Sequence, residues 1–352
     1  MGDSLQRIPI TVLTGFLGSG KTTLINTLLR KPDLRDTAVI VNEFGDIPLD
    51  HLLVVSSSDN VVVLDSGCLC CVVLDSFKET LADLYHRRTR AEVPPFSRVI
   101  VETTGLADPA PLMQVLLRDS FVSHYFELAA LVTTVDAIFG PSQYETNREA
   151  IKQTALADRI VITKADGASA EAIAKARAAI AAINSHASVY LSPNESFDVE
   201  RVLLDPGART QLSFGDSDVM LTAMSSHRHD ESVRSRSFVT DRPLHWAGIA
   251  GWSELVRKEL GSKLLRCKGL VRIHGLDTPV LVQGVQTVFA PPTRLPAWPS
   301  DDRRSRIVCI TQGVPDELLE ASFTALFAEP GTYPPASIRE LQSRTSEHGS
   351  NA

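Results

Sequence analysis

Short apolar runs alternate with segments of helical periodicity along the first 200 residues of the chain. These runs are strand candidates, and they cover residues 8–13, 37–41, 61–64, 98–101, 128–135, 159–163 and 188–191. Between them, apolar residues recur at helical spacing, as at 24–29, 76–88 and 169–183. Strands that alternate with helices predict an α/β fold, with a mostly parallel sheet and helices on both faces. Ligands bind such sheets at the carboxyl ends of the strands, so polar motifs there are functional candidates.

The pattern changes after about residue 200. Residues 205–236 carry Gly, Ser and Asp with little periodicity, which is typical of a linker. A smaller α+β domain follows, with a strand expected from Ser237 and further elements at 244–260, 264–273, 279–289, 306–311 and 316–327. We therefore expect an α/β domain over 1–204, a linker over 205–236, an α+β domain over 237–328 and a disordered tail over 329–352.

The first apolar run leads directly into the sequence GFLGSGKT at 15–22, which satisfies G-x-x-x-x-G-K-S/T. Its glycines allow successive backbone N–H groups to point at phosphate oxygens, and the following helix adds its positive dipole end. We expect Lys21 to reach the terminal phosphates and the Thr22 hydroxyl to bind Mg²⁺. The strand–loop–helix context thus predicts a nucleotide site, whose candidate residues in this loop are Gly15, Gly18, Ser19, Gly20, Lys21, Thr22 and Thr23.

Two later strand ends carry motifs that fit a guanine nucleotide. Glu102 ends one strand, and a carboxylate there can hold Mg²⁺, while the Gly105 N–H can sense a γ-phosphate. The sequence Thr163-Lys164-Ala165-Asp166 ends another strand. Asp166 can accept two hydrogen bonds from the N1–H and N2–H₂ edge of guanine, which adenine does not offer, and the Lys164 stem can cover the base. The alternative is that Asp166 caps the next helix.

A cluster of three cysteines, Cys68, Cys70 and Cys71, follows the strand candidate at 61–64. Three thiolates in four residues suit Zn²⁺, or Co²⁺ at similar geometry, and leave one tetrahedral position open. The alternative is three buried cysteines that act as small hydrophobic residues. Cys267 and Cys309 stand alone in strand-like stretches and are expected in the core.

Two weaker candidates accompany the cysteines. Glu43 and Asp46 follow the strand candidate at 37–41, where they could lie near Mg²⁺ or the transferable metal in a switch loop over 43–50. A solvated strand end explains them equally well. His227 and His229 lie in the expected linker and could take up a metal ion, although two histidines in a polar segment are more often simply exposed.

Composition narrows the class of protein. The chain has 352 residues, of which 43% are hydrophobic and 22% charged, as in a soluble globular protein. A formal net charge of −7 without a basic run argues against nucleic acid as a partner. We see no signal-like segment and no apolar run long enough to span a bilayer, so a cytoplasmic protein is expected. Clustered cysteines in that reducing compartment favour metal or redox chemistry.

The chain closely resembles the CobW-like branch of the metal-handling P-loop GTPases. The motifs that carry this resemblance are, in order, GFLGSGKTT, VNEFGD, GCLCC, ETTGLADP and TKAD. The stretch KLLRCKGLVRIHG resembles that branch's C-terminal domain, so the resemblance spans roughly residues 8–328. It implies GTP hydrolysis coupled to delivery of zinc or cobalt to a client protein, with Cys68, Cys70 and Cys71 as the metal ligands. Because neither an arginine finger nor a general base can be assigned, slow intrinsic turnover is expected. Glu102 then stands at the family's Glu-x-x-Gly position.

Two departures from the family pattern matter. Many members carry a long histidine-rich stretch, whereas only His227 and His229 remain here, so metal storage is not expected. Thr163 replaces the Asn usual in the guanine motif.

Two alternative functions stay open. One is a nucleotide-gated metal sensor without turnover, and the other is a P-loop kinase with structural cysteines. A homodimer also stays open.

Overall fold

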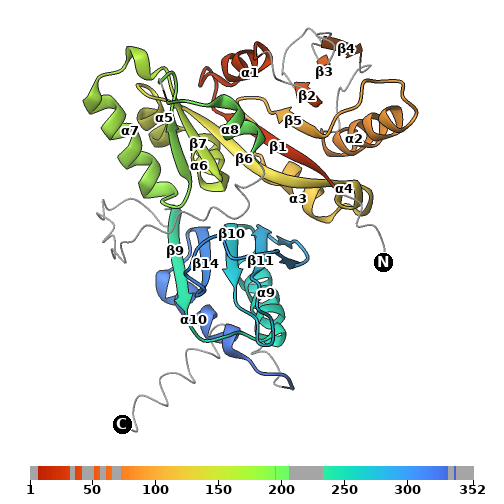
Figure 1. The fold of residues 1–352 in the computed structure, drawn as a ribbon. Coiled ribbons are helices and arrows are strands. Elements are labelled where there is room, and N and C mark those ends of the chain that lie inside the picture. Colours follow the sequence, from red (N-terminus) through yellow and green to blue (C-terminus); the bar gives the residue numbers. More distant parts are fainter. Residues whose placement is uncertain are drawn as a thin grey trace. The chain divides into compact units, whose positions relative to one another are not determined.

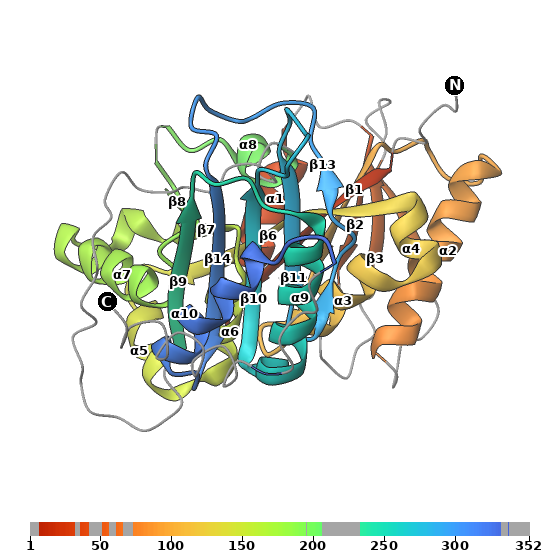
Figure 2. The same ribbon diagram turned by 90° about the horizontal axis from the view of Figure 1, so that it is seen from below.

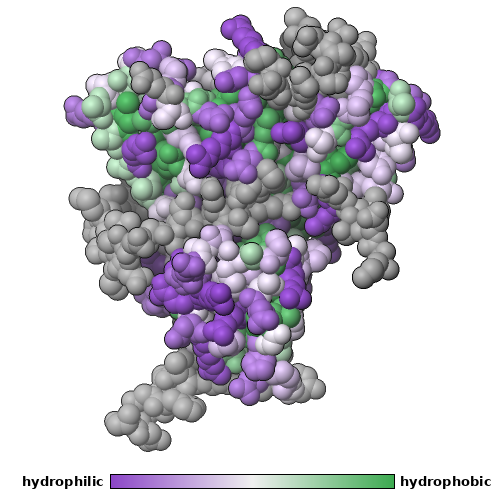
Figure 3. All heavy atoms as spheres, viewed as in Figure 1, coloured by the Kyte–Doolittle hydropathy of each residue, from purple (hydrophilic) through white to green (hydrophobic). Residues whose placement is uncertain are grey.

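The computed structural model describes residues 7–31, 36–41, 51–55, 61–65, 73–194, 196–205, 233–331 and 337. The chain divides into two compact units, Met1–Ser217 and Asp218–Ala352. In the part of the chain that is described, no helix is long and apolar enough to cross a membrane. Figure 3 shows hydrophobic groups scattered among hydrophilic ones over the visible described surface.

The first unit is built around an eight-stranded sheet with strand order β4-β3-β2-β5-β1-β6-β7-β8. Its strands are β1 (Ile8–Gly15), β2 (Thr37–Val41), β3 (His51–Val55), β4 (Val61–Asp65), β5 (Arg98–Glu102), β6 (Phe126–Asp136), β7 (Arg159–Thr163) and β8 (Ser188–Leu191). Six neighbouring strands of this sheet, β2-β5-β1-β6-β7-β8, are parallel to one another. β3 pairs antiparallel with both β2 and β4. β1 therefore lies in the middle of the sheet, with its glycine-rich end at the carboxyl edge (Figure 1).

Helices cover both faces of this sheet, as the sequence predicted. They are α1 (Lys21–Leu29), α2 (Val73–Thr89), α3 (Ala110–Arg118), α4 (Ser120–Tyr125), α5 (Gly140–Thr146), α6 (Arg148–Leu156), α7 (Ala170–Ile183) and α8 (Val199–Leu204). Alternate residues of β7 enter different cores: Val161 packs with α1 and α8, whereas Ile160 and Ile162 pack with α7. This alternation follows from the period of two along a strand, and it confirms the predicted fold class.

One strand of the first unit was not predicted from the sequence. β3 occupies His51–Val55, directly after the expected switch loop, and runs antiparallel to its neighbours. An alternation of strands and helices does not predict β3, because no segment of helical periodicity separates residues 51–55 from the strand at 61–65. A short connection suffices between antiparallel strands, and here it replaces the crossover helix that parallel strands need.

The second unit is an antiparallel sheet covered by helices. Its elements are β9 (Val233–Thr240), α9 (Trp246–Leu260), β10 (Leu264–Val271), β11 (Val280–Val285), β12 (Val288–Phe289), β13 (Thr293–Arg294), β14 (Ser305–Gln312) and α10 (Asp316–Phe323). The path β12-β11-β10-β14-β9 forms the sheet, and β13 pairs with β11. Figure 2 shows α9 and α10 lying over one face of it. The expected pairing of the two strands around 274–277 is confirmed by the β10–β11 register.

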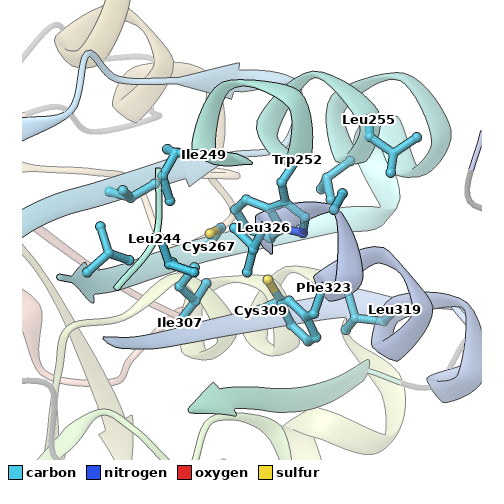
Figure 4. Close-up of a cluster of buried hydrophobic side chains, with 14 of the residues drawn as sticks. Leu244, Ile249, Trp252, Leu255, Cys267, Ile307, Cys309, Leu319, Phe323 and Leu326 are labelled. Carbon is cyan, nitrogen blue, oxygen red and sulfur yellow. The ribbon is translucent and has the colours of Figure 1, made fainter. Parts of the chain in front are cut away.

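Several elements differ from the sequence expectation in this unit. The strand expected at 279–289 is divided into β11 and β12, and β13 was not expected. β9 begins at Val233, four residues before the expected start, because its alternating Arg and Ser residues hide a strand whose partner β14 supplies the hydrogen bonds. The last helix ends at Phe323 and continues as a 3₁₀ turn over Thr324–Phe327. The core beneath these helices contains Trp252, Phe323, Cys267 and Cys309 (Figure 4).

Candidate nucleotide site

The glycine-rich loop begins where β1 ends and passes close to the neighbouring strand β6. Gly15 has φ +145°, and a Cβ placed on it would lie 2.2 Å from Thr134 Oγ1 and 2.5 Å from the Thr134 carbonyl oxygen. Both the backbone angle and the lack of space require glycine at this position. The first glycine of the motif therefore fixes the point at which the loop leaves the sheet.

Lys21, the first residue of α1, is buried against its own loop. Its Nζ donates to the Gly15 carbonyl at 2.9 Å and to the Phe16 carbonyl at 3.4 Å. The helix starts from Gly20 in the left-handed region, and its N-cap makes no side-chain hydrogen bond. The backbone N–H groups of the first turn and the Lys21 ammonium therefore lie at the same helix end. Such an arrangement favours binding of an anion.

Thr22 and Glu102, which the sequence proposed as a pair of magnesium ligands, lie in contact. The Thr22 hydroxyl donates to Glu102 Oε1 at 2.9 Å across 80 residues of sequence. Glu102 is buried at the end of β5, whereas Thr22 is exposed. A hydroxyl and a carboxylate are hard oxygen donors, the type that Mg²⁺ prefers, so the donor set fits that ion.

The loop after β5 rests directly on the glycine-rich loop. A Cβ on Gly105 would lie 2.7 Å from the Leu17 nitrogen, so only glycine allows this approach. From α6, Gln153 Nε2 donates to the carbonyls of Gly105 (3.1 Å) and Ala107 (3.0 Å). Gln153 is fully buried, and its neighbour Lys152 forms an ion pair with Asp108 at 2.8 Å. Two adjacent side chains of α6 thus hold the loop that follows Glu102.

Buried hydroxyl groups connect the strand ends around the site. The Thr163 hydroxyl donates to the Ser19 carbonyl at 2.7 Å, and the Ser19 and Thr134 hydroxyls lie 2.7 Å apart. On the other side of β1, the Thr103 hydroxyl donates to Thr14 Oγ1 at 2.8 Å. Each hydroxyl is satisfied inside the protein, so the loop is held by bonds that cost little to bury. These bonds join the ends of β5, β1, β6 and β7.

The predicted guanine motif begins at the last residue of β7. Lys164 has φ +56°, and its ammonium lies 2.6 Å from Asp136 Oδ2 at the end of β6. Burial by itself raises the pKa of Asp136, but hydrogen bonds from Lys164 and from the Phe139 and Ile138 amides outweigh burial and lower that pKa below its ordinary value. Asp136 is therefore held as an anion beside the motif.

Asp166 lies exposed in a 3₁₀ turn over Ala165–Gly167, two residues beyond Lys164. It does not cap the helix that follows. Ser169 is the N-cap of α7, and its hydroxyl accepts from the Ala172 amide at 3.1 Å. The capping explanation for Asp166 is therefore wrong, and its carboxylate stays accessible at the carboxyl edge of the sheet.

The candidate ligands of the transferable metal are not among the described residues. Cys68, Cys70, Cys71, Glu43, Asp46, His227 and His229 all lie outside the described residues. Within the described ranges, no group of three or more His, Cys, Asp or Glu residues could hold a metal ion. Cys267 and Cys309 are fully buried and lie opposite each other on β10 and β14, which confirms that they are core residues.

Sequence reasoning missed several residues that shape this site: Thr14, Thr103, Thr134, Asp136 and Gln153. Threonines at the ends of apolar strands are a signal that could have pointed to the hydroxyl bonds. Gln153 and Asp136 offer no such signal, because their roles depend on which loops the fold brings beside them.

A strand, a glycine-rich loop and a helix at the carboxyl edge of a parallel sheet define a P-loop nucleotide-binding protein. Residues 9–191 match the model of the CobW/HypB/UreG nucleotide-binding domain, and residues 233–327 match the CobW C-terminal domain. The chain belongs to the CobW/HypB/UreG family of P-loop GTPases. The resemblance seen in the sequence motifs is thereby confirmed.

Its relatives include two zinc chaperones. YjiA of Escherichia coli (strain K12) is 30% identical over 322 residues, covering 92% of this chain and 99% of its own. CobW of Pseudomonas aeruginosa is 31% identical over 348 residues, covering 88% of each chain. The crystal structure of the Zn(II)-bound YjiA GTPase from E. coli has a TM-score of 0.68 at 27% identity, covering 91% of this chain and 99% of that one.

Proposed function

We propose that this chain hydrolyses GTP to GDP and phosphate and, coupled to that reaction, passes a divalent metal ion to a client metalloprotein in the cytoplasm. Zinc is the preferred ion and cobalt the second choice, and neither nucleic acid nor membrane is a partner. The observation that carries the proposal is the convergence of the glycine-rich loop, the Thr22–Glu102 contact and the guanine motif at one sheet edge. Relatives named as zinc chaperones support the metal.

In this proposal the nucleotide binds across the carboxyl edge of the first unit. The backbone of Gly15, Gly18, Ser19, Gly20 and Thr23 surrounds the phosphates, and Lys21 contacts the terminal ones. Thr22 and Glu102 would hold Mg²⁺, which when bound would neutralise charge on the phosphate oxygens. Thr163, Lys164 and Asp166 form the guanine site. The Gly105 amide is the candidate sensor of the γ-phosphate, and the packing of its loop against Leu17 of the glycine-rich loop supports this role.

Cys68, Cys70 and Cys71 are the proposed ligands of the transferable metal, with Glu43 and Asp46 as further candidates. The sheet register supports coupling to the nucleotide. β4 ends at Asp65, level with the end of β2, and β2 pairs with β5 at Glu102. Cys68 follows Asp65 by three residues in the sequence. The cysteine motif is therefore attached to the same sheet edge as the Glu102 loop, although Cys68 itself lies outside the described residues.

The proposed coupling uses two segments that follow strands. When GTP is bound, the loop after Glu102 and residues 43–50 close on the phosphates and bring the cysteines into ligand geometry. After hydrolysis these segments relax and the ion leaves to the client. Intrinsic turnover is expected to be slow, as in GTPases that wait for a partner to complete their site.

The decisive experiment measures zinc and cobalt affinity by competition with a chromophoric chelator, in the presence of a GTP analogue, GDP or no nucleotide. We expect the GTP analogue to raise zinc affinity at least tenfold and Cys70→Ala to remove that affinity. Cys267→Ala serves as the matched control, because it deletes a thiol from the core of the second unit. Zinc affinity that ignores both nucleotide and Cys70→Ala would refute metal delivery.

Phosphate release then separates the enzyme from a sensor. Over many turnovers, the wild-type chain should release more than one phosphate per protein, and Lys21→Ala should release none. Coupled zinc binding without multiple turnover would instead establish a nucleotide-gated metal sensor.

A further inference from the structure

Asp136, the last residue of β6, is a buried carboxylate with three donors. Oδ1 accepts from the amides of Ile138 (2.8 Å) and Phe139 (2.9 Å), and Oδ2 accepts from Lys164 Nζ at 2.6 Å. Only 2% of Asp136 is exposed. It pairs with Thr163 in the β6–β7 register, so it stands directly beside the start of the guanine motif. This carboxylate belongs to neither the phosphate site nor the guanine motif.

Lys164 needs an external partner to keep its conformation. Its φ of +56° lies in the left-handed region, which is unfavourable for a residue with a Cβ. Such a conformation persists only where the surroundings hold it. Here the preceding Thr163 is tied to the Ser19 carbonyl, and the side chain of Lys164 is tied to Asp136. The backbone and the ammonium of the motif are thus held at two separate points.

The ion pair has a second consequence for the residue that selects the base. Lys164 and Asp166 are two residues apart in a tight turn, so an unrestrained lysine could neutralise the Asp166 carboxylate. With the ammonium drawn to Asp136, the four methylenes of Lys164 are left as an apolar face and Asp166 keeps its charge for a ligand. A purine with donors on its edge needs both features, a flat apolar wall and a charged acceptor.

We propose that Asp136 is a positioning residue for guanine specificity: it holds Lys164 as the wall of the base site and keeps Asp166 available to the base edge. This inference rests on the proposed function, because it concerns the same guanine site. It predicts that loss of the Asp136 charge weakens discrimination among bases, beyond any general loss of nucleotide affinity.

The test compares Asp136→Asn with a matched control elsewhere in the same unit. Asp119 has the same arrangement: its Oδ1 accepts from the Phe121 and Val122 amides, and its Oδ2 pairs with Lys78 at 2.9 Å. It caps α4 and carries no proposed role in binding. Both variants remove a charge from a carboxylate that caps a turn, so both should lower Tm. The drop should be larger for Asp136→Asn, because the Asp136 side chain is 3% exposed and that of Asp119 is 17% exposed.

The measurement is the affinity ratio of GDP to inosine diphosphate, which lacks the N2 amine, by displacement of a fluorescent GDP. We expect Asp136→Asn to reduce this ratio at least fivefold, while Asp119→Asn leaves it unchanged. Equal loss of affinity for both nucleotides in Asp136→Asn would show a purely structural role and would overturn the inference.

A double-mutant cycle tests whether the effect passes through Lys164. Lys164→Met keeps the methylene stem without the ammonium, so adding Asp136→Asn to it should cause no further loss of discrimination. Additive losses would overturn the assigned route. The proposed function fails separately, if the wild-type chain does not prefer GDP to ADP.

Discussion

The carboxyl edge of the first sheet and the core of the second unit are built from opposite materials. Both regions belong to sheets covered by helices. The carboxyl edge of the first sheet, however, contains the buried polar residues Thr14, Ser19, Glu102, Thr134 and Asp136. The second buries Leu, Ile and Val side chains around Trp252, with two cysteines among them (Figure 4). Buried polar groups need partners and fix geometry, whereas apolar packing supplies stability. Buried polar groups thus gather at the sheet edge where we propose that the nucleotide binds, and apolar groups gather in the core that stabilises the second unit.

The cysteines show the same contrast. A hydrogen bond with Cys267, together with burial, raises the pKa of the Cys309 thiol well above its ordinary value. A thiol must lose its proton to bind a metal, so Cys309 is unsuited to metal binding. Both cysteines are fully buried and serve as small apolar residues. Metal chemistry is left to Cys68, Cys70 and Cys71 of the first unit, as proposed.

The largest expected effect is a loss of stability in the second unit that leaves nucleotide binding by the first unit intact. Trp252 is fully buried, stacks near Phe323 and donates from Nε1 to the Ser322 hydroxyl at 3.3 Å. Trp252→Ala should lower the free energy of unfolding of the second unit by about 3–5 kcal/mol. GDP affinity, measured by calorimetry below the melting range, should stay within about twofold of wild type. A marked loss of GDP affinity would break the separation between binding and packing.

The reverse experiment removes a binding group and leaves the core intact. Lys21→Ala deletes the ammonium at the start of α1, and we expect GDP affinity to fall at least about a hundredfold, or about 3 kcal/mol. Lys175→Ala, on the exposed face of α7, should leave that affinity unchanged. Calorimetric titration of both variants decides the matter. GDP binding that survives in Lys21→Ala would show that the glycine-rich loop is not the phosphate site.

The smallest effect concerns the charge on Asp136. Because its folded pKa is lowered, its stabilising effect is present above the unfolded pKa near 3.8 and is lost as the pH falls through the folded value. The stability difference between wild type and Asp136→Asn, no more than about 2 kcal/mol, should be constant from about pH 8 to 5, begin to shrink near the unfolded pKa and disappear only below the lowered folded pKa. Urea unfolding at each pH provides the test. A difference that grows with acidity would contradict the paired carboxylate.

Much of the candidate site could be predicted because its signals are local. The glycine-rich loop needs a strand before it and a helix after it, and all three lie within residues 8–29. The contact between Thr22 and Glu102 followed from the rule that parallel strands end at one edge of the sheet. β3 was missed, because its antiparallel pairing breaks the alternation on which the strand assignment relied. The sequence also allows Asp166 to cap the next helix, and only the position of Ser169 as the N-cap of α7 excludes this role.

The amino-acid sequence by itself determined the family, the α/β class, the loop that suits phosphates and the identity of the cysteine motif. These depend on residue types at short, fixed spacings. The tertiary structure alone decided which distant residues contact the site. Gln153 donates a hydrogen bond to the loop after Glu102, Thr163 donates one to the Ser19 carbonyl, and Asp136 forms an ion pair with Lys164. Each of these contacts joins segments far apart in the chain, and their meeting depends on strand order and register, which local spacing does not encode.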